Sequence, residues 1–390
     1  MVSAFYDRFP YPGDPLQDGP PPGYNWRWCV DSAWAAATGA LPPRLPADLH
    51  GARLMDAGCG TGVSTDYLCH LNPGSSVLAV DISAGALEVA RERTRRSGAA
   101  KALRELRIEQ RSLLDLAGEG PFDYINSVGV LHHLREPEAG LQALAGLLRP
   151  GGLLHLFLYA DGGRWEIHRT QRALARLAVG SGDEGLRLGR QLLAELPEGN
   201  RLRQHHERRW IVDTAADANF ADMYLHPQET SYNLERLLAF VASAGLEFAG
   251  FSNPEVWSPA RLLSGELLER AQGLSQLEQW SLVDELDPDI SHFEFFLSDG
   301  AVRAPDWGDD EVLLAARGEI NRCLWGWPAT RLMGPDLMPL DVSEEGLNLM
   351  AALESAPGVA IGQLPLDWSA AQRIAVARQL LNQRVLLPVL

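Results

Sequence analysis

The sequence predicts an α/β fold built on a parallel sheet that helices cover on both faces. From residue 53 onward, short apolar runs alternate with amphipathic helical segments, which is the pattern of strands joined by crossover helices. The first apolar run ends in an acidic residue and three glycines at alternate positions, so the chain can turn sharply into a helix. A hydrophobic content of 46% with 22% charged residues is typical of a folded protein.

The elements of this sheet follow in order along the chain. Seven strands are expected at 54–57, 77–81, 106–108, 124–128, 153–159, 246–251 and 292–297. Helices are expected after Gly62 and at 84–96, 138–148 and 234–244. Leucines at helical spacing predict that residues 163–209 form a helical insertion that caps the carboxyl edge of the sheet.

Two further regions flank this central domain, which we place at 49–300. Residues 1–48 are rich in proline, glycine and aromatic residues, a composition that favours an extended arm. Residues 301–390 contain two expected helices and a final strand, and their order resembles a winged-helix-like α+β appendage. In so acidic a chain we interpret this appendage as a module for packing or for forming a homodimer, rather than for binding DNA.

Composition excludes several classes of protein. A net charge of −17 repels phosphate backbones, so nucleic acid is not expected as a partner. No apolar run approaches the roughly 20 residues that span a bilayer, and the first residues lack a signal-peptide pattern, so we expect a cytoplasmic protein without a membrane partner. Four cysteines without a C-x-x-C pair, and carboxylates that are not clustered at ligand spacing, predict no metal site. Lys101 is the single lysine, which excludes Schiff-base chemistry.

The glycine-rich turn at 54–62 carries the most information about the ligand. Its spacing is G-x-G-x-G, whereas the dinucleotide fingerprint requires a further glycine at the position of Val63. Asp56 just before the turn suits a ligand with a positively charged amino group. Asp81 ends the next strand, where a carboxylate can accept hydrogen bonds from both ribose hydroxyls. The two carboxylates therefore predict a nucleoside that carries an amino-acid part.

Together with segments 121–125, 127–134 and 148–153, this turn resembles the class I S-adenosylmethionine-dependent methyltransferase family, whose sheet is Rossmann-like. The resemblance implies S-adenosylmethionine as cofactor and S-adenosylhomocysteine as product. By that resemblance the turn and Asp56 hold the methionine part, Asp81 the ribose, Ser112 and Leu113 flank the adenine, and Ser127 and Val128 line the floor. The implied cofactor-binding residues are Asp56, Gly58, Cys59, Gly60, Thr61, Gly62, Asp81, Ile82, Ser112, Leu113, Ser127 and Val128.

The flanking segments 6–12 and 224–229 resemble parts of bacterial methyltransferases that sometimes accompany further domains. We interpret the arm as a lid that brings Tyr6 and Tyr11 near the sulfonium, where aromatic faces attract a cation; structural packing of both rings is the alternative. His132 follows the fourth strand and is a candidate proton acceptor, although a histidine there is also common at the start of a helix. Candidate substrate contacts are His133, Tyr159, Trp165, His168 and His226.

These motifs do not identify the methyl acceptor, and three interpretations stay open. A small-molecule nucleophile is favoured, because the insertion and the aromatic arm suggest an enclosed pocket. A protein side chain is the alternative, since similar arms and C-terminal domains occur in some protein methyltransferases. In the third interpretation the chain binds the cofactor without catalysis and acts as a scaffold or sensor.

Overall fold

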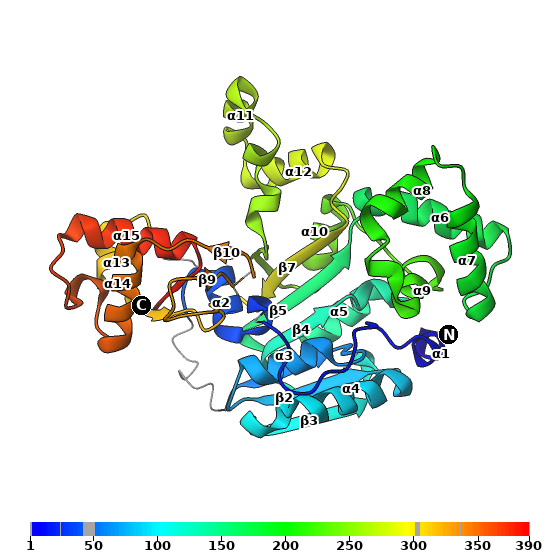
Figure 1. The fold of residues 1–390 in the computed structure, drawn as a ribbon, viewed down its shortest axis with the longest axis horizontal. Coiled ribbons are helices and arrows are strands. Elements are labelled where there is room, and N and C mark those ends of the chain that lie inside the picture. Colours follow the sequence, from blue (N-terminus) through cyan, green and yellow to red (C-terminus); the bar gives the residue numbers. More distant parts are fainter. Residues whose placement is uncertain (1, 24, 42–50, 301–304, 336, 390) are drawn as a thin grey trace.

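The computed structural model describes residues 2–23, 25–41, 51–300, 305–335 and 337–389 (Figure 1). Its centre is a seven-stranded sheet in the order β3-β2-β1-β4-β5-β7-β6, in which β7 runs antiparallel to both neighbours and the other pairs are parallel. The strands are β1 Arg53–Ala57, β2 Ser76–Asp81, β3 Glu105–Gln110, β4 Phe122–Val128, β5 Leu148–Tyr159, β6 Glu247–Phe251 and β7 His292–Ser298. The predicted α/β sheet is confirmed.

Helices cover both faces of the sheet because successive side chains of a buried strand point to opposite sides. The helices that flank the sheet are α2 Val30–Thr38, α3 Val63–Leu71, α4 Ala84–Ser97, α5 Pro137–Ala145 and α10 Leu234–Ala242. On β1, Met55 belongs to the core under α5 and α10, whereas Leu54 belongs to the core under α2 and α3. Adjacent residues of β1 thus contribute to two different cores.

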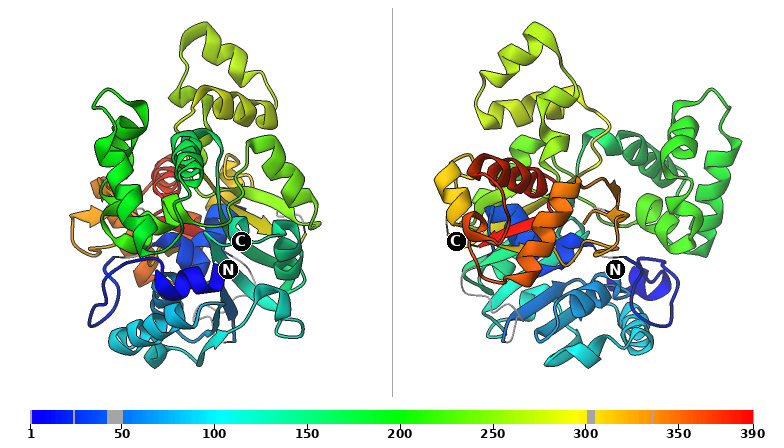
Figure 2. Two further views of the ribbon diagram at one scale, coloured as in Figure 1. Left: turned by 90° about the vertical axis from the view of Figure 1, so that its right-hand side faces the viewer. Right: turned by 60° about the vertical axis from the view of Figure 1, so that its left-hand side comes forward.

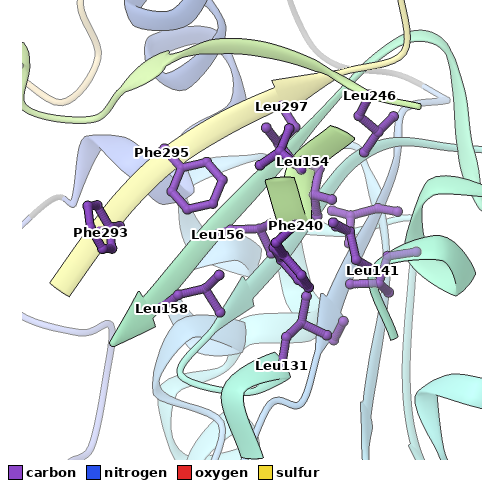
Figure 3. Packing of buried hydrophobic residues seen from close by; sticks show 14 of the residues in the cluster. Leu131, Leu141, Leu154, Leu156, Leu158, Phe240, Leu246, Phe293, Phe295 and Leu297 are labelled. Atoms are coloured by element: carbon purple, nitrogen blue, oxygen red, sulfur yellow. The ribbon is translucent and has the colours of Figure 1, made fainter. Parts of the chain in front are cut away.

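Figure 3 shows the larger core, to which β5 and β7 contribute alternate residues. These residues are Leu154, Leu156, Leu158, Phe293, Phe295 and Leu297. They pack against Leu141 of α5 and Phe240 of α10. Phe295 is fully buried and stacks on Phe248 of β6 with ring centroids 5.5 Å apart. This packing fixes β7 between β5 and β6 and so completes the sheet.

The helical insertion between β5 and α10 is longer than the sequence predicts. It consists of α6 Trp165–Arg176, α7 Asp183–Glu195, α8 Arg201–His205, a π-helical turn His206–Trp210 and α9 Asp217–Leu225. It lies beside the N-terminal helix in Figure 1. The expected end at residue 209 misses α9, which carries buried residues of the same small core, including Phe220 and Tyr224.

The arm is less extended than its composition indicates. Residues Val2–Arg8 form α1, and the arm also contains α2. Phe5 and Phe9 are buried in the core of the insertion with Phe220, so tertiary packing overrides the local preference for extended structure. The predicted boundary at residue 48 lies outside the described residues.

Two other parts complete the chain. Helices α11 Gly265–Gln272 and α12 Gln276–Leu286, which the sequence did not predict, lie between β6 and β7 and project away from the sheet (Figure 2). The C-terminal part contains α13 Asp310–Ala315, β8 Arg317–Ile320, β9 Leu332–Met333, β10 Pro339–Leu340, α14 Glu344–Ser355, α15 Ala370–Asn382 and β11 Leu386–Val389.

The C-terminal part has its own core, and β11 pairs antiparallel with β8. It joins α2 through the hydroxyl of Ser32, which donates to Oδ1 of Asn321 at 2.6 Å. Its likeness to a winged helix and its role in a homodimer stay predictions. No described helix combines the length and the apolarity that a membrane span requires.

Replacing Phe295 by alanine should lower the free energy of unfolding by about 3–5 kcal/mol, because the substitution leaves a cavity in the larger core. Urea unfolding followed by circular dichroism measures this change. Leu267→Ala in α11 is the matched control, since that side chain is 63% exposed and should change stability by less than about 0.5 kcal/mol. Equal effects of the two substitutions would contradict the packing described for β7.

Candidate active site

The site begins at the glycine turn, which connects β1 to α3 at the point where the strand order reverses between β1 and β4. Gly58, Gly60 and Gly62 have φ of 83°, 50° and 80°, the left-handed region that glycine adopts without strain. A Cβ at Gly58 would overlap the side chain of Val130, and one at Gly60 would overlap the carbonyl oxygen of Tyr11. The first two glycines therefore allow both the sharp turn and the close approach of other segments.

Asp81 lies beside this turn at the end of β2. Its Oδ2 accepts a hydrogen bond from the Gly60 N–H at 2.9 Å, and its Oδ1 accepts one from the Ser83 N–H at 2.8 Å. Burial raises the pKa of the Asp81 carboxyl, while the two backbone N–H groups act in the opposite direction. Asp81 and the following Ile82 line a cavity that the turn also borders.

Asp56 lies just before the turn, as the sequence predicts, and its carboxylate is hydrogen-bonded to neighbouring side chains. Its Oδ2 accepts hydrogen bonds from the hydroxyls of Ser64 at 2.8 Å and Thr65 at 2.5 Å, and its Oδ1 accepts one from Nδ2 of Asn126 at 2.8 Å. The carboxylate is buried behind the turn and is absent from the cavity lining. Asp56 thus holds α3 and β4 to the end of β1, and a direct ligand contact stays a prediction.

Three other implied cofactor residues also lie behind the cavity wall. The Ser127 hydroxyl donates to the carbonyl of Ala57 at 3.0 Å, and the Thr61 hydroxyl donates to the carbonyl of Pro12 at 2.7 Å. Gly62 contacts α4, where a Cβ would lie 2.8 Å from that of Ala90. These three residues support the cavity wall but do not line the cavity.

The cavity has a volume of about 220 Å³ and lies at the carboxyl ends of β1, β2 and β4. The residues that the sequence predicted and the cavity brings together are Tyr6, Tyr11, Gly58, Cys59, Gly60, Asp81, Ile82, Ser112, Leu113, Val128 and His133. Trp28 and Arg111 also line it and were not predicted, since neither belongs to a recognised motif. Most of the proposed cofactor contacts therefore meet in one place.

The N-terminal arm forms one wall of this cavity through backbone contacts with the turn. The carbonyl of Tyr11 accepts a hydrogen bond from the Thr61 N–H at 3.0 Å. Arg93 of α4 donates from Nη2 to the carbonyl of Asp14 at 2.8 Å and from Nη1 to the carbonyl of Pro15 at 3.1 Å. The arm is thus fixed across the turn, and its function as a lid stays a prediction.

A polar cluster lies directly behind the arm. Asp222 of α9 accepts a hydrogen bond from the Tyr6 hydroxyl at 2.8 Å and one from the Tyr159 hydroxyl at 3.2 Å. Burial raises the pKa of the Asp222 carboxyl above its usual range. Four ring side chains lie around this carboxylate, those of Tyr6, His133, Tyr159 and His226. We call these four residues and Asp222 the Asp222 cluster. Asp222 has no sequence motif, so the sequence did not indicate it.

Of the two adjacent histidines, the structure places His133 and not His132 in the cavity wall. His132 is fully buried and stacks on Tyr159 with ring centroids 3.8 Å apart. Its ring nitrogens have no hydrogen-bond partner among the described residues, and burial lowers its pKa. The position of His132 therefore does not support the catalytic role predicted for it.

Two predicted substrate contacts lie away from the cavity. His168 is within hydrogen-bond distance of Glu229, with its Nε2 3.0 Å from Oε1, and the other oxygen of Glu229 pairs with Arg164 at 2.9 Å. Trp165 is 41% exposed and borders a separate groove of about 1120 Å³ between the insertion and the turn before β7. That groove begins at Asp161, two residues after Tyr159 of the Asp222 cluster.

His133, Asp222 and His226 place possible metal-ligating atoms within 4.8 Å of one another. The two imidazole rings are only 3.8 Å apart by their centroids, and Nδ1 of His226 already accepts the Gln228 N–H at 3.1 Å. Closely packed, tilted rings with one nitrogen occupied suit a hydrogen-bonded cluster better than two ligands of one ion. We therefore assign no metal to these residues.

Comparison with known proteins places this site in a family. Residues 55–154 match a family model described as a methyltransferase domain. The chain is 46% identical over 394 residues to the uncharacterized protein syc1184_c of Synechococcus sp., which covers 100% of this chain and 93% of that protein. It is 49% identical over 96 residues, 25% of this chain and 86% of the relative, to an uncharacterized phycocyanin operon protein W of Pseudanabaena tenuis.

A more distant relative is a ubiquinone biosynthesis O-methyltransferase of Xanthomonas euvesicatoria pv. vesicatoria, 35% identical over 136 residues. That match covers 34% of this chain and 51% of the relative, so the chain spans about half of that protein. The fold is similar to PKMT2 from Rickettsia typhi, with a TM-score of 0.62 at 18% identity over 94% of this chain and 77% of that one. PKMT2 has also been solved in complex with AdoHcy, with a TM-score of 0.59 at 18% identity over 80% of this chain and 59% of that one.

These findings agree with the motif order, the sheet topology and the cavity at the glycine turn. Residues 55–154 thus form a methyltransferase domain, the sheet has the Rossmann-like class I methyltransferase fold, and the whole chain belongs to the same family as the Synechococcus protein syc1184_c.

Proposed function

We propose that the chain transfers a methyl group from S-adenosylmethionine to a protein side chain presented at the wall formed by Tyr6, Tyr11 and His133. The observation that carries this proposal is that one cavity joins the glycine turn and Asp81 to this polar, aromatic wall. A cofactor held by the turn would have its reacting end close to groups that can contact a nucleophile.

The residues of the cavity fit this cofactor. Gly58, Cys59 and Gly60 of the turn line the cavity, and Asp81 offers carboxylate oxygens to ribose hydroxyls. Leu113 and Ile82 supply apolar surface of the kind that an adenine ring requires. Tyr6 and Tyr11, with ring centroids 6.5 Å apart, offer aromatic faces to a positively charged sulfur.

When bound, the cofactor supplies a methyl group that a sulfonium makes electrophilic. The chain's own task is to hold the nucleophile about 3–3.5 Å from that carbon and to exclude water. The arm supports both requirements, because its backbone is fixed to Thr61 and its tyrosines close the wall. The hydroxyl of Tyr6 is itself held by Asp222, so this part of the wall is preorganised.

The surface beside the cavity supports a protein acceptor, because a polypeptide substrate needs an extended surface next to the place where its side chain reacts. The open groove that starts at Asp161 and is bordered by Trp165, Glu166 and Arg201 gives a neighbouring surface for the rest of a polypeptide.

A small-molecule acceptor is the second candidate, and one observation favours it. The relative that is a ubiquinone biosynthesis O-methyltransferase is 35% identical over 136 residues. That match covers only 34% of this chain, whereas the arm and the insertion contribute Tyr6, Tyr11 and Asp222 to the acceptor side of the site. The small-molecule proposal therefore has support mainly from a single shared segment.

Gly60→Ala should weaken the binding of S-adenosylhomocysteine by at least about tenfold, because the added methyl group would displace the arm and disturb the Gly60 N–H bond to Asp81. Isothermal titration calorimetry measures the affinity. Gly118→Ala is the matched control, since Gly118 also has a positive φ, of 87°, but a Cβ there meets nothing within 4 Å. Unchanged affinity in Gly60→Ala would exclude the turn as the cofactor cradle.

Radiolabelled S-adenosylmethionine tests the acceptor class. Because one relative is named for the phycocyanin operon, the first polypeptide to test is phycocyanin produced in a host without this chain. A cyanobacterial extract, divided by a size filter, is tested in parallel, with Asp81→Ala as the background variant. We expect label on a polypeptide.

Label confined to the small-molecule filtrate would overturn the protein acceptor in favour of the second candidate. Label in neither fraction, from protein that still binds S-adenosylhomocysteine, would support the interpretation as a scaffold or sensor.

A further inference from the structure

The backbone of Gln228, in the loop after α9, contacts both histidines of the Asp222 cluster. Its carbonyl oxygen lies 2.9 Å from Nδ1 of His133, and its N–H donates to Nδ1 of His226 at 3.1 Å. A carbonyl oxygen can only accept a hydrogen bond, so Nδ1 of His133 carries the hydrogen. An amide N–H can only donate, so Nδ1 of His226 carries the lone pair.

These two bonds fix opposite tautomers in two adjacent rings. In a neutral imidazole one nitrogen carries the hydrogen and the other the lone pair. Nε2 of His133 is therefore a hydrogen-bond acceptor and Nε2 of His226 a donor. Burial lowers the pKa of both rings to about 4, so both are neutral near pH 7 and each carries a single ring hydrogen.

The lone pair on Nε2 of His133 has no protein partner among the described residues. His133 lines the cavity with 5% of its surface exposed, and Nε2 has no hydrogen bond within the described part of the chain. Oδ1 of Asp222 is 3.9 Å from Nε2 of His133, which is too far for a hydrogen bond. A second bond holds the residue in place, since Nε2 of Gln228 donates to the His133 carbonyl at 2.8 Å.

We propose that His133 is the catalytic residue that accepts the proton of the methyl acceptor through Nε2, and that Gln228 is the positioning residue that fixes its tautomer. This inference rests on the proposed function. The lone pair of the nucleophile forms the bond to the methyl carbon while the carbon–sulfur bond breaks and its electron pair goes to sulfur. The proton leaves the nucleophile for Nε2 of His133 and passes later to water. The acceptor is thus a group that carries an N–H or O–H.

The groups around His133 explain why a neutral ring can act there. The titratable and charged groups that face it are Tyr6 of the arm, His132 of its own turn, Tyr159 of β5, Arg164, Asp222 and His226 of the insertion, and Glu229. Arg164 pairs with Glu229 at 2.9 Å, so that neighbouring positive charge is balanced. The result is an imidazole in the cavity wall that is neutral near pH 7 and therefore has a free lone pair to accept a proton.

The first test measures the tautomers without any acceptor. Nitrogen-15 NMR of histidine-labelled protein, saturated with S-adenosylhomocysteine at pH 7, distinguishes protonated from unprotonated ring nitrogens. We expect Nε2 of His133 and Nδ1 of His226 to be the unprotonated ones, with assignments from His133→Gln and His226→Gln. A protonated Nε2 in His133 would overturn the inference, whatever the outcome for the proposed function.

The second test uses the rate at which the purified chain labels the extract fraction that accepts methyl groups. His133→Gln should reduce that rate about 10²–10⁴-fold, because an amide cannot take up the proton. Affinity for S-adenosylhomocysteine should stay within about twofold. His132→Phe is the matched control: it keeps the ring stacked on Tyr159, removes only unbonded nitrogens and should retain most of the rate.

The pH profile separates a base from a merely structural residue. The wild-type rate should be nearly constant from pH 8 to 6 and should fall toward acid as His133 protonates, with an apparent pKa well below the usual 6.5. His133→Gln should lose that acid limb, and imidazole added to His133→Ala should restore part of the rate. A wild-type rate in His133→Gln, or an unchanged acid limb, would overturn the role of His133. An inactive wild-type protein with the expected NMR pattern would instead refute the proposed function.

Discussion

The rest of the site depends on the contact between the backbone of the arm and the glycine turn. Thr61 donates its N–H to the carbonyl of Tyr11, and Gly60 has no side chain because that carbonyl occupies the space. The N–H of Gly60 also holds Asp81. Gly60 therefore joins Asp81 on one side of the cavity to the arm on the other, and a displacement of either segment is transmitted to the other.

Behind this contact, buried polar groups supply the rigidity that short turns lack. Asp56 receives three side-chain hydrogen bonds from α3 and β4, and Ser127 of β4 donates back to β1. A carboxylate placed inside the protein is tolerated when such donors replace water. Asp56, which belongs to the family motif in the sequence, thus connects β1, α3 and β4 at the edge of the sheet that borders the cavity.

Local patterns predicted the sheet and the turn, since alternating strands and helices and the spacing of glycines are visible within a few residues. They could not indicate α1, whose Phe5 and Phe9 are buried by helices far along the chain. Nor could they choose between His132 and His133, because the short helical turn after β4 decides which ring faces the cavity. Asp222 reaches Tyr6 across a separation of 216 residues and carries no motif, so only the folded chain reveals it.

The loop at Gln228 has a consequence for how this protein responds to substitution. The bonds to both imidazoles come from main-chain atoms, so they persist with almost any side chain at that position, while proline would remove the N–H that His226 requires. Gln228→Ala would therefore remove the bond from the side chain to the His133 carbonyl but would leave both bonds to the imidazole rings. The tautomers of the two rings depend on the path of the loop and not on the side chain at this position.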